Sequence, residues 1–230
     1  SLMSKISVIL LCGGRGTRMA VDKPKQFLEI QGKTIADYSL DVLKKIQGLV
    51  EIVVVCDPAY RSFFSNDQDT LPLHFALPGV RRQDSVLNGL RAIESNPDLV
   101  CIHDSARPFI NQEMVSRTIS AAMDYGAATA AMPIKFTIKE HDGHQFVKNT
   151  PDRSLYWEIQ TPQVIKLELL KKGFEHVIQH HLTVTDDVSI VELLNLPVKL
   201  VEGSYNNLKI TTPDDLILAD CLLKQISSYG

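Results

Sequence analysis

Short apolar runs recur along the chain, separated by segments in which apolar and polar positions are mixed. The runs are apolar almost throughout instead of alternating with polar residues, which is typical of strands buried on both faces of a sheet. We therefore predict strands at Ile6–Leu11, Ile52–Cys56, Leu99–His103, Ala127–Ile134 and Val198–Val201.

Between these runs, apolar residues recur at intervals of three and four, the spacing of one face of a helix. These segments predict helices around residues 35–43, 86–93, 114–123 and 216–226. In the last of them the apolar face consists of Leu216, Ala219, Leu223 and Ile226, and Pro213 stands near its start, where a missing N–H costs little. Strands that alternate with helices predict an α/β fold with a Rossmann-like, mostly parallel sheet flanked by helices. Ligands bind such sheets beyond the carboxyl ends of the strands.

One stretch departs from this pattern. Residues 135–156 alternate loosely around His141-Asp142-Gly143, which is a turn signal. We interpret the stretch as a hairpin arm that leaves the main sheet. Because an isolated two-stranded ribbon is only marginally stable in water, we expect the arm to pack on another subunit.

Size and charge narrow the class of protein. The 230 residues suit one hydrophobic core, so we predict a single domain over residues 3–230, with Ser1 and Leu2 a remnant of expression. The hydrophobic share of 44% and the charged share of 22% are ordinary for a globular protein. A net charge of −3 argues against a protein that mainly coats nucleic acid or a membrane surface.

The cysteines and the apolar runs predict a location. No apolar stretch approaches the roughly 20 residues of a membrane helix, and the start lacks a basic-then-apolar leader. The four cysteines form no CxxC pair, and three of them lie in a predicted strand or directly after one, as reduced, buried cysteines do. We therefore expect a cytoplasmic protein.

The strongest chemical signal follows the first predicted strand. Gly13, Gly14 and Gly16 allow the backbone to turn sharply and to approach a ligand, and consecutive N–H groups there can cradle phosphate oxygens. Arg18 and Lys25 add positive charge beyond the glycines. A Walker loop would end in Gly-Lys-Ser/Thr, and a dinucleotide fingerprint would have a small residue at position 19, which is methionine here. A plain glycine turn with solvated basic residues is the remaining alternative.

A second signal, His103-Asp104-Ser105-Ala106-Arg107-Pro108, ends another predicted strand. A carboxylate at the carboxyl end of a strand lies where ligands bind in an α/β fold. Because Mg²⁺ prefers hard oxygen ligands, Asp104 is a candidate metal ligand. A lone Asp at a strand end is more often part of a turn or cap. His103 has no partner histidine at metal-ligand spacing, and we interpret it as a structural residue.

A loop and two isolated basic residues indicate a binding site less strongly than the two motifs above. Residues 78–86 (Pro-Gly-Val-Arg-Arg-Gln-Asp-Ser-Val) form a loop that enters a helix, and Asp84 or Ser85 can cap that helix. Arg153 and Lys209 are isolated basic residues, which are usually solvated surface charges.

Together these segments resemble the signature of nucleotidyltransferases that activate sugars and polyols. Pro24-Lys25-Gln26-Phe27-Leu28 and the order Asp-Ser-Ala-Arg-Pro make the chain similar to the polyol-phosphate cytidylyltransferase family over about residues 6–223. The resemblance implies the fold of the nucleotide-diphospho-sugar transferases and a homodimer that exchanges its arms. It also implies transfer of CMP from CTP to 2-C-methyl-D-erythritol 4-phosphate with Mg²⁺ or another divalent cation. Ribitol- or ribulose-5-phosphate cytidylyltransferase is the alternative, and a regulatory nucleotide-binding module is a rival from another class.

The resemblance also implies roles for individual residues. Catalysis is expected from Arg18, Lys25, Arg153 and Lys209, and Mg²⁺ binding from Asp104. CTP binding is expected from Cys12, Gly13, Gly14, Gly16, Gly79, Val80, Ser85, Asp104 and Ser105. Binding of the polyol phosphate is expected from Arg107, Thr137, Arg153, Thr185 and Lys209. One position departs from the pattern, because many relatives have Asp-Asn where this chain has Asn206-Asn207.

Overall fold

A seven-stranded sheet forms the centre of the computed structural model, which describes residues 3–13, 24–64 and 71–229. The strand order is β11-β7-β10-β6-β1-β4-β5. All neighbouring strands are parallel except for β10, which is antiparallel to both β6 and β7. The strands of this sheet are β1 (Ile6–Leu11), β4 (Leu49–Val55), β5 (Leu73–Ala76), β6 (Leu99–Asp104), β7 (Ala127–Pro133), β10 (Trp157–Lys166) and β11 (Lys199–Glu202).

The predicted α/β class and mostly parallel sheet are confirmed, with each predicted strand shifted at its ends by no more than a few residues. Two strands of this sheet, β5 and β10, were not predicted from the sequence. The short β5 lies at the edge of the sheet and contains His74, and β10 includes polar residues such as Gln160 and Gln163. These polar residues interrupt the apolar runs from which strands were predicted.

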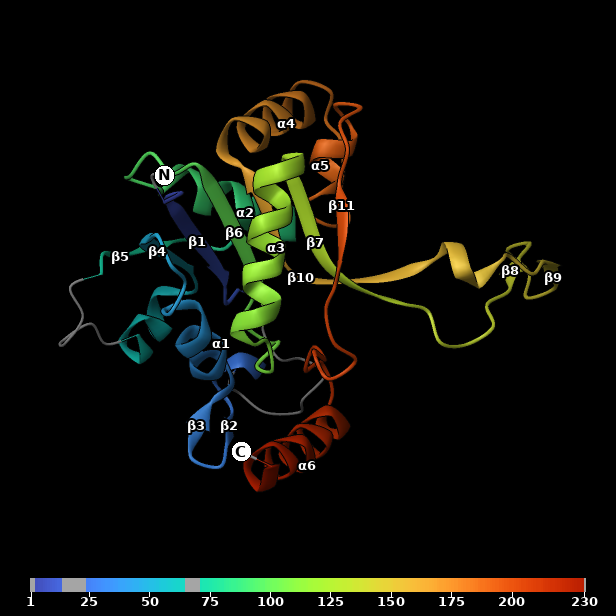
Figure 1. Ribbon diagram of the computed structural model, residues 1–230, viewed down its shortest axis with the longest axis horizontal. Coiled ribbons are helices and arrows are strands. Elements are labelled where there is room, and N and C mark those ends of the chain that lie inside the picture. Colours follow the sequence, from blue (N-terminus) through green and yellow to red (C-terminus); the bar gives the residue numbers. More distant parts are fainter. Residues whose placement is uncertain (1–2, 14–23, 65–70, 230) are drawn as a thin grey trace.

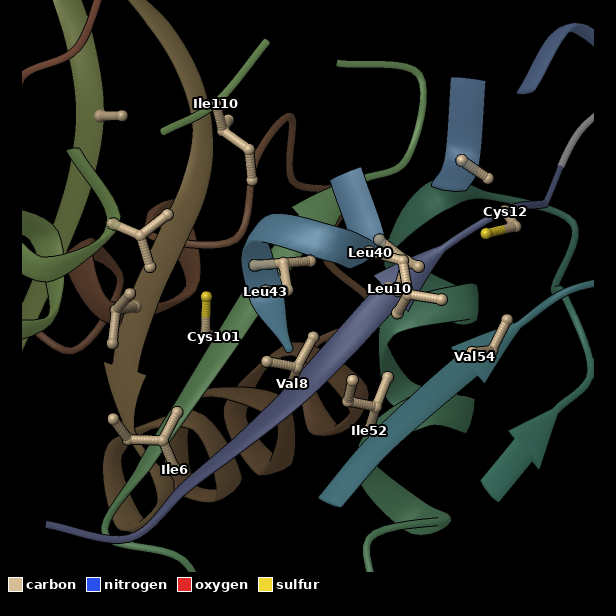
Figure 2. Close-up of a cluster of buried hydrophobic side chains, with 14 of the residues drawn as sticks. Ile6, Val8, Leu10, Cys12, Leu40, Leu43, Ile52, Val54, Cys101 and Ile110 are labelled. Atoms are coloured by element: carbon tan, nitrogen blue, oxygen red, sulfur yellow. The ribbon is translucent and has the colours of Figure 1, made fainter. Parts of the chain in front are cut away.

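Helices cover both faces of the sheet (Figure 1). The helices α1 (Ile35–Leu43) and α3 (Gln112–Tyr125) pack on one face, whereas α2 (Arg82–Arg91), α4 (Leu167–Gln179) and α5 (Ser189–Glu192) pack on the other. Successive side chains of β1 therefore enter the cores on opposite faces of the sheet. Figure 2 shows Ile6, Val8 and Leu10 on the side of α1, whereas Ile9 and Leu11 belong to the core on the other face. In the described ranges, no helix is long and apolar enough to cross a membrane.

The C-terminal helix α6 (Pro213–Tyr229) packs outside this layered body, against the small ribbon of β2 (Glu29–Ile30) and β3 (Lys33–Thr34) (Figure 1). Ala219 is buried there, and Leu216 and Leu223 pack beside Ile30. The predicted apolar face was wrong at its last member, because Ile226 is 50% exposed near the end of the helix.

The predicted hairpin arm is present and projects from the body (Figure 1). It contains β8 (Glu140–His141) paired with β9 (Val147–Asn149), followed by a short 3-10 turn at Arg153–Leu155. Two other 3-10 turns, at Lys25–Phe27 and Pro58–Phe63, lie in the body. Large apolar side chains of the arm are exposed to solvent: Phe136 is 79% exposed, Phe146 73% and Leu155 77%. Because the chain leaves the sheet after β7 and returns as its neighbour β10, these two strands are antiparallel.

A buried carboxylate joins three strands at the amino-terminal edge of the sheet. Glu51 on β4 accepts hydrogen bonds from the hydroxyls of Ser7 and Ser95 and from the backbone N–H of Glu94, and its Oε1 lies 3.4 Å from Nε2 of His74. Burial by itself raises the pKa of Glu51, but the hydrogen bonds from Ser7, Ser95 and Glu94 outweigh burial and lower the pKa overall.

The substitution Glu51→Gln is expected to destabilise the fold at pH 7 by about 2 kcal/mol, because an amide N–H₂ would then face hydrogen-bond donors. Since the native pKa of Glu51 lies below its unfolded value, the unfolded state binds more protons between the two values. The stabilisation of the fold by the ionised Glu51 is therefore complete above its unfolded pKa of about 4.3, and it is lost as the pH falls through the native pKa. Urea midpoints of wild type and variant should converge in acid; a difference independent of pH would contradict the role of the charge.

Candidate active site

A pocket of about 230 Å³ opens at the carboxyl ends of β1 and β6. This is the position that the α/β sheet predicts for a ligand site. Cavities of about 500 and 690 Å³ lie elsewhere, between α1 and α3 and around the start of β6, and Gly13 is not among the described residues that line them. The smaller pocket is lined by Leu11, Gly13, Lys25, Gln26, Gly79, Val80, Arg81, Arg82, Ser85, Asp104, Ser105, Ala106 and Lys209.

Two backbone segments meet in one wall of this pocket. A Cβ at Gly79 would lie 2.3 Å from the Cβ of Asp84, and a Cβ at Gly13 would lie 3.0 Å from the Cβ of Pro78, so the first position has no room for a side chain and the second is tight. The Ser85 hydroxyl accepts a hydrogen bond from the Gly79 N–H at 2.9 Å, which fixes the loop on the first turn of α2. The wall therefore presents main-chain groups to the pocket.

An ion-pair network lies at the base of the pocket. Arg82 donates to Oδ1 of Asp104 at 2.9 Å and to both carboxylate oxygens of Asp187 at 2.8 and 3.0 Å. The Nζ of Lys209 lies 3.4 Å from Oδ2 of Asp104. Asp104 thus has one cation on each oxygen, and these contacts join β6, α2 and the loop before α6.

The charges around Asp104 keep it ionised. Burial by itself raises the pKa of Asp104, but Arg82 and Lys209 outweigh burial and hold the pKa well below its usual range. Burial raises the pKa of Asp187 in spite of its contact with Arg82. No role was predicted for Arg82 or Asp187 from the sequence, although Arg82 lies within residues 78–86 and Asp187 lies two residues after Thr185.

Three residues expected to bind ligand are hydrogen-bonded to the protein itself or buried in it. The Ser105 hydroxyl donates to the Leu11 carbonyl at 2.7 Å and so fastens β6 to β1. Nη1 of Arg107 donates to the Asn207 carbonyl at 2.6 Å, outside the pocket lining. Cys12 is buried, and burial raises the pKa of its thiol. The Ser105 and Arg107 side chains therefore engage the protein itself in this structure.

Other expected site residues are not gathered in the pocket. Thr137 and Arg153 lie on the arm, where Nη1 of Arg153 donates to the Lys135 carbonyl at 2.7 Å. Thr185 is exposed on the segment before α5, two residues from Asp187. Arg18, Gly14 and Gly16 lie outside the described residues. The pocket does bring together Gly13, Lys25, Gly79, Val80, Ser85, Asp104, Ser105 and Lys209.

Glycine-lined backbone, cations and the ionised Asp104 meet at the carboxyl edge of a mostly parallel sheet. Backbone N–H groups and cations suit phosphates, and Mg²⁺ in nucleotide sites uses one or two carboxylates together with phosphate oxygens. Fold and site together define the class of α/β nucleotidyltransferases.

Comparison with known proteins gives the family within this class. A family model described as 2-C-methyl-D-erythritol 4-phosphate cytidylyltransferase matches residues 6–225. A chloroplastic enzyme of that name from Oryza sativa subsp. japonica is 49% identical over 222 residues, covering 96% of this chain and 75% of the rice protein. An enzyme of the same name from Chlamydia abortus is 42% identical over 223 residues, covering 97% of this chain and 98% of the relative.

Solved structures agree with this result. The 4-diphosphocytidyl-2C-methyl-D-erythritol synthase of Anaerococcus prevotii superimposes with a TM-score of 0.85 at 29% identity, covering 96% of this chain and 99% of the other. The 2-C-methyl-D-erythritol 4-phosphate cytidylyltransferase of Thermus thermophilus gives a TM-score of 0.78 at 31% identity, with the same coverage. The chain belongs to the 2-C-methyl-D-erythritol 4-phosphate cytidylyltransferase family.

Proposed function

We propose that the pocket beyond β1 and β6 is where this cytidylyltransferase transfers CMP from CTP to 2-C-methyl-D-erythritol 4-phosphate, a step in the synthesis of isoprenoid precursors. The products are 4-diphosphocytidyl-2-C-methyl-D-erythritol and pyrophosphate. The observation that carries the proposal is Asp104, held between Arg82 and Lys209 in a pocket that also contains Gly13 and Lys25. Family membership favours this acceptor over ribitol or ribulose 5-phosphate.

The reaction needs neutralisation of charge more than proton transfer. The acceptor phosphate is largely dianionic near neutral pH, because its second pKa is about 6, and needs no general base. One of its oxygens forms a bond to the α-phosphorus of CTP, and the bridging oxygen leaves with its electron pair as part of pyrophosphate. Lys25 and Lys209 line the pocket and are placed to offset the charge of these phosphates.

Asp104 fits the part of a Mg²⁺ ligand, because it is ionised, lines the pocket and offers hard oxygens. Among the described residues, no group of three or more His, Cys, Asp or Glu side chains could hold a metal alone. Triphosphate oxygens are expected to supply further ligands. Bound there, Mg²⁺ would neutralise phosphate charge during transfer.

The proposed active form is a homodimer in which Thr137 and Arg153 serve the partner's pocket. Both residues belong to the arm, residues 135–156, which projects from the body (Figure 1), and neither is among the described residues that line the pocket with Lys25 and Lys209. The exposed apolar side chains of the arm favour burial against a second copy. We also place the enzyme in the cytoplasm, which suits its buried, unpaired cysteines Cys12, Cys56 and Cys101.

Pyrophosphate release from CTP tests the proposed reaction. Release is expected with 2-C-methyl-D-erythritol 4-phosphate and not, at comparable kcat/KM, with ribitol 5-phosphate or ribulose 5-phosphate. Preference for either of the latter would replace the proposed acceptor with the alternative. Binding of CTP without turnover of any acceptor would instead indicate a regulatory module.

The main-chain wall at Gly79 and Val80 is expected to favour CTP over other nucleotides. A buried donor or acceptor that the wrong base leaves unpaired is costly, so kcat/KM with UTP or ATP should be lower by about 10²-fold or more. Initial rates with each triphosphate at fixed acceptor concentration measure this selectivity. Similar values for CTP and UTP would contradict base recognition at this wall.

A further inference from the structure

Behind the pocket, buried polar groups form a chain of hydrogen bonds that begins at Asp104. The Asp104 N–H donates to Oγ1 of Thr161 at 3.1 Å, and this oxygen lies 2.8 Å from Nδ1 of His103. Nε2 of His103 lies 3.0 Å from the Arg107 carbonyl. His103 is 0% exposed and Thr161 3% exposed, so neither can exchange these partners for solvent.

Only one arrangement of protons satisfies this chain. The Arg107 carbonyl can only accept, so Nε2 of His103 carries the ring proton. His103 is fully buried, and its neutral ring has one N–H, which Nε2 carries, so Nδ1 accepts the Thr161 hydroxyl proton. With its proton held there, the Thr161 oxygen directs a lone pair to the Asp104 N–H.

The loop that bears Lys209, the cation beside Asp104, is also hydrogen-bonded to Thr161. Nδ2 of Asn207 donates to the Thr161 carbonyl at 2.9 Å, and the Asn207 carbonyl accepts from Arg107 at 2.6 Å. Lys209 follows two residues later and reaches Asp104 at 3.4 Å. Thr161 therefore connects the backbone of Asp104 to the loop that bears Lys209.

We propose that His103 is a positioning residue: by accepting the Thr161 hydroxyl proton, it holds Asp104 where the carboxylate meets Arg82 and Lys209. His103 lies outside the pocket lining and is assigned no contact with substrate or metal. The inference rests on the proposed role of Asp104 in CTP and Mg²⁺ binding. Partners that orient a metal-binding side chain typically contribute 10- to 100-fold to metal affinity or activity.

Two substitutions separate the functions of the ring nitrogens. In His103→Asn the amide oxygen can take the place of Nδ1 and accept from Thr161, whereas in His103→Gln the amide nitrogen can take the place of Nε2 and donate to the Arg107 carbonyl. The Ser39 hydroxyl lies 2.9 Å from that carbonyl and 3.1 Å from the Ser105 carbonyl, so the first variant leaves the Arg107 carbonyl a donor within reach. The second variant leaves the Thr161 proton without its acceptor.

Kinetics and calorimetric CTP binding in Mg²⁺ compare the two variants. His103→Gln is expected to weaken CTP binding and to lower kcat/KM by about 10- to 100-fold, whereas His103→Asn stays within a few-fold of wild type. A role in packing alone predicts the reverse order, because asparagine is smaller and leaves the larger cavity. Equal losses or the reverse order would overturn the inference. If the variants do not fold, Thr161→Ser and Thr161→Val provide the same comparison, with serine near wild type and valine impaired; equal activities would overturn the inference.

A double-mutant cycle tests whether His103 acts through Asp104. If it does, His103→Gln should cause little further loss of CTP binding in an Asp104→Asn background, because the two residues work as one unit. The same fold-loss in both backgrounds would overturn the inference and leave the proposed function intact. Wild-type turnover by Asp104→Asn alone would instead overturn the proposed role of Asp104 and, with it, the inference.

Discussion

Replacing Lys25 with alanine is expected to lower kcat/KM by about 10²–10³-fold while leaving the thermal midpoint within a few degrees of wild type. Lys25 lines the pocket beside Gly13. In the proposed reaction, charge develops there on the triphosphate as the bond between the α-phosphorus and the bridging oxygen breaks. Loss of one well-placed electrostatic contact has an effect of this size because the rest of the site cannot reorganise to replace it. Steady-state kinetics with CTP and the polyol phosphate measure the loss.

Lys171→Ala is the matched control, since it removes an exposed lysine from α4, outside the pocket lining. Its kcat/KM should equal that of wild type. From the family resemblance, Arg18→Ala is expected to behave like Lys25→Ala, although Arg18 lies outside the described residues. Near-normal turnover by either active-site variant would remove that residue from the mechanism.

Mixing two inactive variants is expected to restore activity. Arg153→Ala and Lys25→Ala homodimers should each be nearly inactive. If Arg153 serves the partner's pocket, a mixed dimer has one site with both lesions and one intact site. Random pairing makes half the dimers mixed, and half the sites in each of these work, so activity should rise to about one quarter of wild type. Pyrophosphate release after subunit exchange measures it.

Lys25→Ala mixed with Lys209→Ala is the control for this experiment. Both lysines line the pocket of one chain, so each site of that mixed dimer keeps one lesion and activity should stay at background. If the Arg153 mixture also stays at background after exchange is verified by mass-tagged subunits, the shared-site proposal fails.

The parts of the fold predicted from sequence are those that local pattern determines. Strands such as β1 and β6 are buried on both faces, so their apolar runs stand out, and α3 keeps one apolar stripe against the sheet. In contrast, β10 contains Gln160, Thr161 and Gln163, whose polar groups are buried in hydrogen bonds with distant segments. Its sequence alone gives no reason to expect those partners.

The same distinction holds within the pocket. Gly13 and Gly79 stand in loops that flank regular elements, so local sequence draws attention to them. The contact of Arg82 with Asp187 joins residues 105 positions apart, and each residue alone is typical of a solvated helix end. The resemblance implies that Ser105 and Arg107 contact ligand, and the structure adds hydrogen bonds from their side chains to the Leu11 and Asn207 carbonyls, which no local pattern indicates. Which way a side chain turns at a strand end depends on partners that fold around it.

The order in which the pocket's charges are synthesised has a consequence for the growing polypeptide. Arg82 and Asp104 leave the ribosome early, whereas Asp187 follows Arg82 by 105 residues and Lys209 comes later still. At about 5–20 residues per second, Asp187 is added about 5–20 seconds after Arg82. During that interval β1, β4 and β6 can assemble, but Arg82 has only one of its two carboxylates. The nascent chain therefore acquires the complete charge arrangement of the pocket only near the end of translation.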